Sequence, residues 1–253
     1  MGGSGTFFGI DSELMEQRLK MTVINAGMHA GLGLNVTLDL FEEYIQPGDQ
    51  ILLIPEYGLL VNSTGMGELG PTISGAISRP TIGARTLEQM VEQVFSSGRP
   101  GLKAVAYTIN QKFGLIQETR GYTALVNQHG DAKELPTSHY RAAPSWKADR
   151  SDFSNYSLQE LQRFRQRVKA KGGHMTISLP WLLAKDEVQT TNQLRRNLAL
   201  LQTISPVVTH LKTLNATSDV SLFSDTVYHL SVKGRQARSD ELVRQLKVLW
   251  SLP

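Results

Sequence analysis

The 253-residue chain contains no cysteine. This absence excludes disulfide frameworks, zinc sites built on thiolates and cysteine nucleophiles, and it fits the cytosol as well as an oxidising envelope compartment. Long apolar runs are missing too, because none reaches the ~18 residues that a membrane span requires. The first residues also lack the basic and apolar regions of a secretory signal. We therefore expect that the chain as given does not cross a membrane.

An excess of charge of one sign is also missing. The 26 lysine and arginine residues against 23 aspartate and glutamate residues leave a net charge of +3, spread along the chain. Proteins that bind nucleic acid normally concentrate basic residues on one face. The charge pattern therefore favours no nucleic-acid partner. The composition, 40% hydrophobic and 19% charged, excludes a disordered or fibrous protein.

The hydrophobic pattern alternates between strand-like and helix-like segments. Apolar, β-rich runs predict strands over residues 21–27, 50–55, 173–179 and 206–211. Residues 9–20 are predicted to form a turn followed by a short helix, and helical spacing predicts further helices over residues 34–45, 86–94, 157–170, 187–204 and 239–250. A capping box, Thr86 with Gln89, marks the third of these helices, and a second box, Ser157 with Glu160, marks the fourth. The alternation predicts one α/β domain over residues 1–253, a three-layer α/β/α sandwich around a mostly parallel sheet.

Two irregular segments interrupt this alternation, at about residues 58–83 and 117–153. The first is rich in glycine, serine, threonine and proline, and the second is polar with little periodicity. Excursions of this length in a compact α/β domain are typical of lids or substrate walls. We therefore expect these segments to border a site.

An acid and a histidine stand four residues apart near the C-terminus, at Asp225 and His229, shortly before the last predicted helix. Sites in open parallel sheets collect at the carboxyl ends of the strands. A carboxylate placed there can accept the imidazole Nδ1–H, which leaves Nε2 free as a base. The alternative interpretation is a surface histidine near a helix start.

The chain begins with a serine surrounded by glycines, Gly2-Gly3-Ser4-Gly5. A turn with so little side-chain bulk lets the backbone N–H of a nucleophile act as an oxyanion donor. The same letters are typical of an expression linker, which is the interpretation that this segment alone favours. A competing nucleophile is Ser12, after Ile10-Asp11; its alternative role is that of a helix N-cap.

Together these segments resemble the SGNH (GDSL-like) hydrolase superfamily. Gly2-Gly3-Ser4 followed by Gly9-Ile10-Asp11-Ser12 is similar to the nucleophile block of its members that modify envelope polysaccharides. The stretch from Asn25 to Gly31 is similar to the second block, and Tyr228-His229-Leu230-Ser231 before Gly234 is similar to the histidine block. The resemblance implies an SGNH/flavodoxin-like fold with Ser4 as nucleophile, His229 as base and Asp225 as its acid. It assigns oxyanion or substrate-binding roles to Gly31, Ala30, Asn25 and Tyr57.

The sequence departs from the pattern of this family at three places. The usual acid position, three residues before the histidine, is Thr226, and the nearest acid is Asp225. The family's third block supplies an asparagine, whereas Pro55-Glu56-Tyr57-Gly58 has none. Losing one oxyanion donor costs ~3 kcal/mol in the transition state, so that either Tyr57 or a backbone amide substitutes or the enzyme is slow. The family also places an apolar strand directly before the nucleophile, so we expect the first strand to be truncated here and the gene product to start upstream.

The resemblance implies acyl chemistry on an O-acyl (acetyl) ester, on a carbohydrate or another small ester. Water as acceptor makes the protein an esterase, and a sugar hydroxyl makes it an O-acetyltransferase of an exopolysaccharide. The alternative from another class is a non-catalytic carbohydrate-binding or assembly protein on a degenerate hydrolase fold. An upstream signal or anchor would place the protein in the periplasm or cell envelope; otherwise it is cytoplasmic.

No cofactor and no metal is expected. His29 lies at a predicted strand end, where it suits a structural role or a pocket wall. Gly31-Leu32-Gly33 falls short of a dinucleotide fingerprint because the third glycine is missing. The other histidines lack an acidic partner at metal-ligand spacing, namely His129, His139, His174 and His210.

Overall fold

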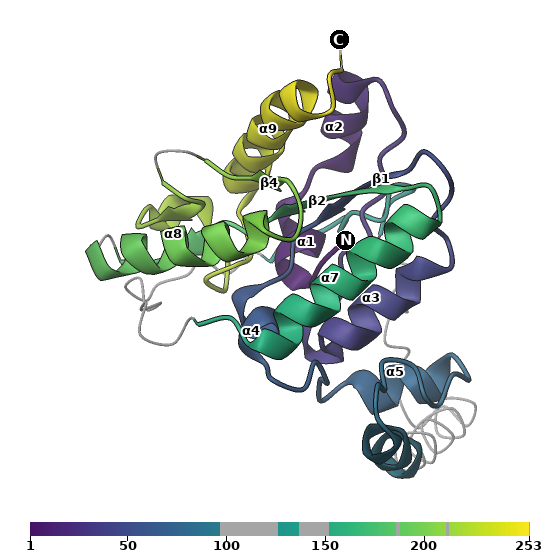
Figure 1. Cartoon of the computed structure of the whole chain (residues 1–253). Helices are drawn as coiled ribbons and strands as arrows, with labels where there is room; N and C mark the ends of the chain where they lie inside the picture. Colours follow the sequence, from purple (N-terminus) through teal and green to yellow (C-terminus); the bar gives the residue numbers. More distant parts are fainter. Residues whose placement is uncertain (97–125, 137–151, 186–187, 211–212, 253) are drawn as a thin grey trace, which may run out of the picture.

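The computed structural model describes residues 1–96, 126–136, 152–185, 188–210 and 213–252 (Figure 1). Within these ranges a three-stranded parallel sheet has the order β1-β2-β4, formed by β1 (Gln50–Leu53), β2 (His174–Ser178) and β4 (Val207–Val208). The β1–β2 register runs from Gln50 opposite His174 to Leu53 opposite Ile177. A second parallel pair joins β3 (Leu182–Leu183) to β5 (Ala216–Thr217). The prediction of a mixed α/β chain with parallel strands is therefore confirmed.

Helices connect and cover these strands. Their bounds are α1 (Ser4–Gly9), α2 (Ser12–Leu19), α3 (Leu34–Glu42), α4 (Tyr57–Val61), α5 (Gly70–Ala76), α7 (Asn155–Ala170), α8 (Val188–Gln202) and α9 (Val232–Leu249). Residues 87–96 are also helical, and short 3₁₀ turns lie at Ala30–Leu32 and Val220–Leu222. None of the described helices is both long and apolar enough to cross a membrane.

The apolar core lies on two sides of the sheet. One cluster joins the sheet to α3, α7 and α8 through residues such as Leu38, Phe164 and Leu198. A second cluster joins it to α2 and α9 through residues such as Met15 and Leu242. Figure 1 accordingly shows α3 and α7 on one side of the sheet, and α2 and α9 on the other. Strand β2 is buried at four consecutive residues, Met175–Ser178, which suits a strand that is covered on both faces.

The predicted strand over residues 21–27 is wrong. This segment is extended, but its one strand contact is an isolated parallel bridge between Gly27 and Gly2, and Gly2 also pairs with Ile54. The Met1–Gly2 segment therefore lies between residues 21–27 and the end of β1. Because neighbouring strands lie ~4.8 Å apart, residues 21–25 are two strand spacings from β1, too far to form a ladder with it. A cavity of about 140 Å³, lined largely by apolar residues, lies in this gap.

The backbone of Met1 forms part of this arrangement. Its α-amino group donates to the Leu52 carbonyl at 2.9 Å, and its carbonyl accepts from the Ile54 amide at 2.8 Å. Burial lowers the pKa of this amino group to about 5. The glycine-rich start of the chain is thus part of the folded domain, in contrast to a flexible linker.

Two helices begin earlier than predicted. The N-cap of α9 is Ser231, whose hydroxyl accepts from the Gly234 amide, so the helix starts at Val232 rather than at residue 239. Similarly, α7 is capped by Ser154, and the expected cap Ser157 lies inside the first turn. In both cases a serine further upstream offers the same capping chemistry, and tertiary packing selects it.

The segment 58–83, expected to be irregular, contains most of α4 and all of α5. Most of the second irregular segment, 117–153, lies outside the described residues. The predicted cap of the helix that follows residue 86 is present, because the Thr86 hydroxyl accepts from the Gln89 amide at 3.1 Å.

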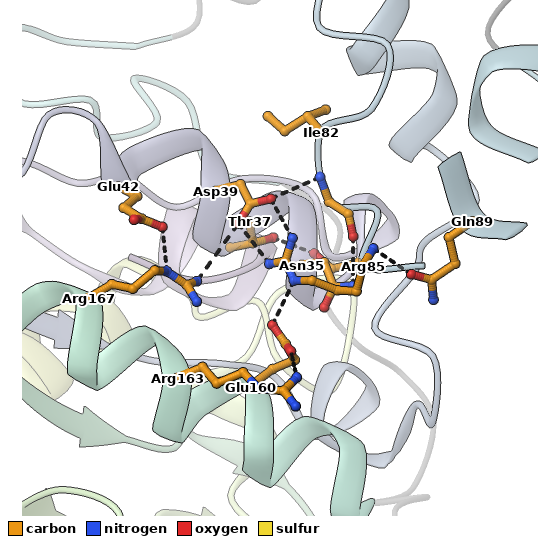
Figure 2. A network of polar contacts seen from close by, with 12 residues as sticks. Asn35, Thr37, Asp39, Glu42, Ile82, Arg85, Gln89, Glu160, Arg163 and Arg167 are labelled. Carbon is orange, nitrogen blue, oxygen red and sulfur yellow. Dashed lines mark hydrogen bonds and ion pairs between the residues drawn. The ribbon is translucent and has the colours of Figure 1, made fainter. Parts of the chain in front are cut away.

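A network of charged side chains joins α3, α7 and the loop at residue 85 (Figure 2). The Arg85 guanidinium donates to both oxygens of Asp39 at 2.8 Å and, through Nε, to Glu160 at 2.9 Å. Arg167 donates to Glu42 at 2.7 Å. Glu160 is completely buried, and a buried carboxylate requires a partner such as the Arg85 guanidinium. The network holds α7 against α3.

Candidate active site

The glycines at the start of the chain are required by close contacts. A Cβ atom at Gly2 would lie 2.2 Å from the Ile54 carbonyl oxygen, and one at Gly3 would lie 2.7 Å from the Glu56 carboxylate. Residues with side chains cannot fit where backbone and carboxylate approach so closely. These contacts place Ser4, the first residue of α1, directly after the extended Met1–Gly2 segment.

The Ser4 side chain points to an acid that follows the end of β1. Its hydroxyl donates to Glu56 Oε1 at 3.1 Å, and the Gly5 amide donates to the same oxygen. Glu56 is only 5% exposed, and it precedes α4 without capping it. Its carboxylate instead lies across the first turn of α1, where free amides attract negative charge.

Asp225 and His229 form the predicted pair. Asp225 Oδ1 lies 2.8 Å from His229 Nδ1, and the side chains are 34% and 14% exposed. The loop is shaped by Thr226, whose hydroxyl accepts from the amides of Tyr228 and His229 at 3.2 and 3.0 Å. With Nδ1 bonded to the acid, the free imidazole nitrogen is Nε2.

Helix α1 packs against this loop, which brings the two ends of the chain together. The Phe8 ring lies 4.6 Å from the His229 ring, measured between centroids. A Cβ atom at Gly5 would lie 3.4 Å from Tyr228 Cβ. Ser4 and Phe8 are four residues apart on one face of α1, so the Ser4 hydroxyl and the His229 ring lie near the same helix face. The hydrogen-bond acceptor of Ser4 in this structure is nevertheless Glu56.

Asn25 ties α1 to the neighbouring segments. Its side-chain amide donates to the Thr6 carbonyl at 3.2 Å and to Asp131 Oδ1 at 2.9 Å, while its oxygen accepts from the Gly27 amide. The residue is 8% exposed. Asn25 therefore fixes the backbone of α1, and its side-chain N–H groups donate to protein acceptors rather than to a bound ester.

Ser12 is completely buried at the start of α2. Its hydroxyl donates to Asp131 Oδ1 at 2.7 Å and its amide donates to Oδ2 at 2.9 Å. The N-cap of α2 is Asp11, which accepts from the Leu14 amide. A buried hydroxyl bonded in this way is not accessible to a substrate, so the structure favours Ser4 over Ser12 as a nucleophile.

Ala30 and Gly31 form a 3₁₀ turn after the extended segment. The Gly31 amide donates to His29 Nδ1 at 2.9 Å, and its carbonyl accepts from the Leu69 amide at 2.8 Å. His29 caps this turn, consistent with a structural role. The Gly31 amide is therefore already bonded, and its predicted role as an oxyanion donor would require that this bond break.

Tyr57 is 2% exposed and stacks on Tyr228 with centroids 6.5 Å apart. Burial raises its pKa well above the usual value, with Tyr228 adding to the shift and Arg238 opposing it. Burial also raises the pKa of Tyr228, and the nearby Glu56 carboxylate adds to this. Both phenols therefore remain neutral, and Tyr57 packs against Tyr228 next to the site.

The most important residue that the sequence analysis missed is Glu56. It lies in the stretch Pro55-Glu56-Tyr57-Gly58, which lacks the asparagine of the family, and an acid next to the end of a parallel strand is itself a signal of a site. Arg238 was also missed. It is 2% exposed on α9 and donates to the Leu179 carbonyl and to Glu241 at 3.0 and 3.2 Å.

Among the residues that the structure describes, no group of three or more histidine, aspartate or glutamate side chains could hold a metal ion. His129 contacts the Val23 carbonyl at 3.3 Å, and His210 accepts from the Thr213 amide at 3.2 Å. His139 lies outside the described residues. The comparison of the whole chain with protein-family models and with curated proteins finds no match.

Proposed function

We propose that the protein is a serine acyl hydrolase of the SGNH type, acting on O-acyl esters through Ser4, His229 and Asp225. The observation that carries this proposal is the packing of α1 against the loop of His229, with Phe8 and the imidazole in ring contact at 4.6 Å. A hydroxyl on a helix that packs against the loop of an imidazole–acid pair supports nucleophilic acyl transfer. The three-layer sandwich and the carbohydrate substrate are part of the same proposal.

In this mechanism His229 takes the proton of Ser4 as the hydroxyl attacks the ester carbonyl. Asp225, bonded to Nδ1 at 2.8 Å, keeps the imidazole oriented and stabilises the cation that forms. The imidazolium then returns the proton to the leaving alkoxide. The Gly5 amide at the start of α1 supplies an oxyanion donor once the carbonyl oxygen replaces Glu56 Oε1 there. Water or a sugar hydroxyl releases the acyl group, which defines the esterase and the O-acetyltransferase variants.

Hydrolysis of p-nitrophenyl acetate tests the proposal. We expect Ser4→Ala and His229→Ala each to lower kcat/KM by ~100-fold or more, because a positioned base and nucleophile supply at least that factor. Ser63→Ala and His174→Ala, at exposed positions, are the matched controls. A fluorophosphonate should label the wild type on the Ser4 peptide. Hydrolysis that neither site substitution changes would overturn the proposal.

A second candidate is a non-catalytic carbohydrate-binding protein on the same fold. The observation that favours it is the Glu56 carboxylate, which occupies the Gly5 amide and accepts the Ser4 hydroxyl. A permanent bond of this kind would hold the nucleophile away from His229. This alternative would be established by two results together: the protein binds an acetylated oligosaccharide, and it shows neither fluorophosphonate labelling nor Ser4-dependent hydrolysis.

A further inference from the structure

The Glu56 carboxylate lies beside any ester that Ser4 could attack. Its Oε1 accepts from the Ser4 hydroxyl at 3.1 Å and from the Gly5 amide, whereas none of the described residues donates a hydrogen bond to Oε2. A Cβ atom at Gly3 would lie 2.7 Å from Oε1 and 3.1 Å from Oε2, so the whole carboxylate rests on the glycine backbone. Oε2 is therefore available to a hydrogen-bond donor on a bound molecule.

No described cation forms an ion pair with Glu56. Arg238 is 2% exposed, and its guanidinium is paired with Glu241 at 3.2 Å. His229 is paired with Asp225. The site thus contains two carboxylates, those of Glu56 and Asp225, against one imidazole.

We propose that Glu56 determines the substrate class of this site: esters whose alcohol part carries a hydroxyl or a cation close to the acyl group, and not esters of anionic alcohols. This inference rests on the proposed acyl-transfer function. A hydroxyl next to the ester can donate to Oε2, and hydrogen bonds to a charged acceptor are the stronger kind. An anionic group at the same place meets a carboxylate that is only 5% exposed and therefore poorly screened.

Four thioesters of acetate test the proposal, because they differ only in the group beside the reacting bond. Their thiols are mercaptoethanol, ethanethiol, thiocholine and mercaptopropionate, which carry a hydroxyl, no polar group, a cation and an anion. A thiol-reactive chromogenic disulfide reports the released thiol, and a chain with no cysteine gives no background. For charges roughly 7 Å apart at an effective dielectric constant of about 20, we expect kcat/KM of the anionic ester to be about 50-fold below that of ethanethiol acetate.

The order expected for the wild type is cation and hydroxyl first, then the ethyl group, then the anion. Glu56→Gln removes the charge and should reduce the difference between neutral and anionic esters to ~3-fold or less. Glu56→Asp keeps the charge and should keep the order. Glu43→Gln, at a side chain that is 54% exposed in a surface pair with Arg79, is the matched control and should leave all four rates unchanged. Circular dichroism of each variant checks folding.

The outcomes separate this inference from the proposed function. Hydrolysis that is equal in wild type and Ser4→Ala overturns the proposed function. Ser4-dependent hydrolysis in which the wild type accepts the anionic ester as well as the neutral ones overturns the role of Glu56 and leaves the function intact. This second result needs no variant, so it stands even if Glu56→Gln does not fold.

Discussion

Replacing Asp131 by asparagine should destabilise the protein strongly. The side chain is completely buried and takes four donors: the Ser12 amide at 2.9 Å, the Ser12 hydroxyl at 2.7 Å, the Asn25 amide at 2.9 Å and Arg235 at 3.2 Å. In Asp131→Asn the oxygen can replace Oδ1, but the NH₂ group then faces the Ser12 amide and the Arg235 guanidinium, which are both donors. The substitution therefore leaves the mostly buried Arg235 cation without its counter-ion, and the buried Ser12 amide without an acceptor.

Breaking a buried ion pair in this way costs about 3–5 kcal/mol. For a chain of this length 1 kcal/mol corresponds to roughly 2–4 °C, so the thermal midpoint should fall by roughly 6–20 °C. Urea unfolding followed by tryptophan fluorescence measures the free energy directly. Asp240→Asn is the matched control, because its pair with Arg18 is partly exposed, at 53% and 31%, and such pairs contribute at most about 1 kcal/mol. Equal small losses in both variants would refute the reasoning.

Three further predictions concern the start of the chain and the charged network. Gly2→Ala should destabilise by ~3 kcal/mol, because its Cβ would meet backbone at 2.2 Å, whereas Gly58→Ala, with no neighbour within 4 Å, should be neutral in the same urea titration. Glu160→Gln should lower the free energy of unfolding by about 3 kcal/mol, because the buried carboxylate accepts a hydrogen bond from the Arg85 guanidinium. The same loss in a variant that lacks Arg85 would contradict this explanation. In a chain that begins at Met1, the pKa of the Met1 amino group is about 5 in the folded state and 8.0 in the unfolded state, so the unfolded state binds more protons between these pH values. The free energy of unfolding should therefore rise with pH across this window, and acetylation of the amino group should flatten this pH profile.

The local pattern of apolar residues predicted the elements whose positions follow from their own sequence. Strands β1 and β2 and helices α3 and α8 lie where apolar periodicity placed them, because each period reports a face that must be buried. Helix starts were less predictable: Ser154 and Ser231 cap where other residues were expected. Several serines near a helix start can each supply a capping hydroxyl, and the packing of the helix decides among them.

The strand expected over residues 21–27 failed for a different reason. Its β-rich composition describes a buried extended segment, which it is, but a ladder also needs a partner at one strand spacing. Gly2 is such a partner only for Gly27, and the remaining residues face the cavity beside β1. Composition indicates extension and burial, and pairing depends on what the rest of the chain places alongside.

The pair of Asp225 and His229 is the part of the site that the sequence by itself determined, because its two members lie only four positions apart in one loop. The contact of Ser4 with Glu56, 52 positions away, and that of Ser12 with Asp131, 119 positions away, were decided only by tertiary structure. A contact between distant segments depends on how helices dock on the sheet, and no local period encodes that geometry. The same docking decided that Ser12 is buried as a structural group while Ser4 contacts the Glu56 carboxylate.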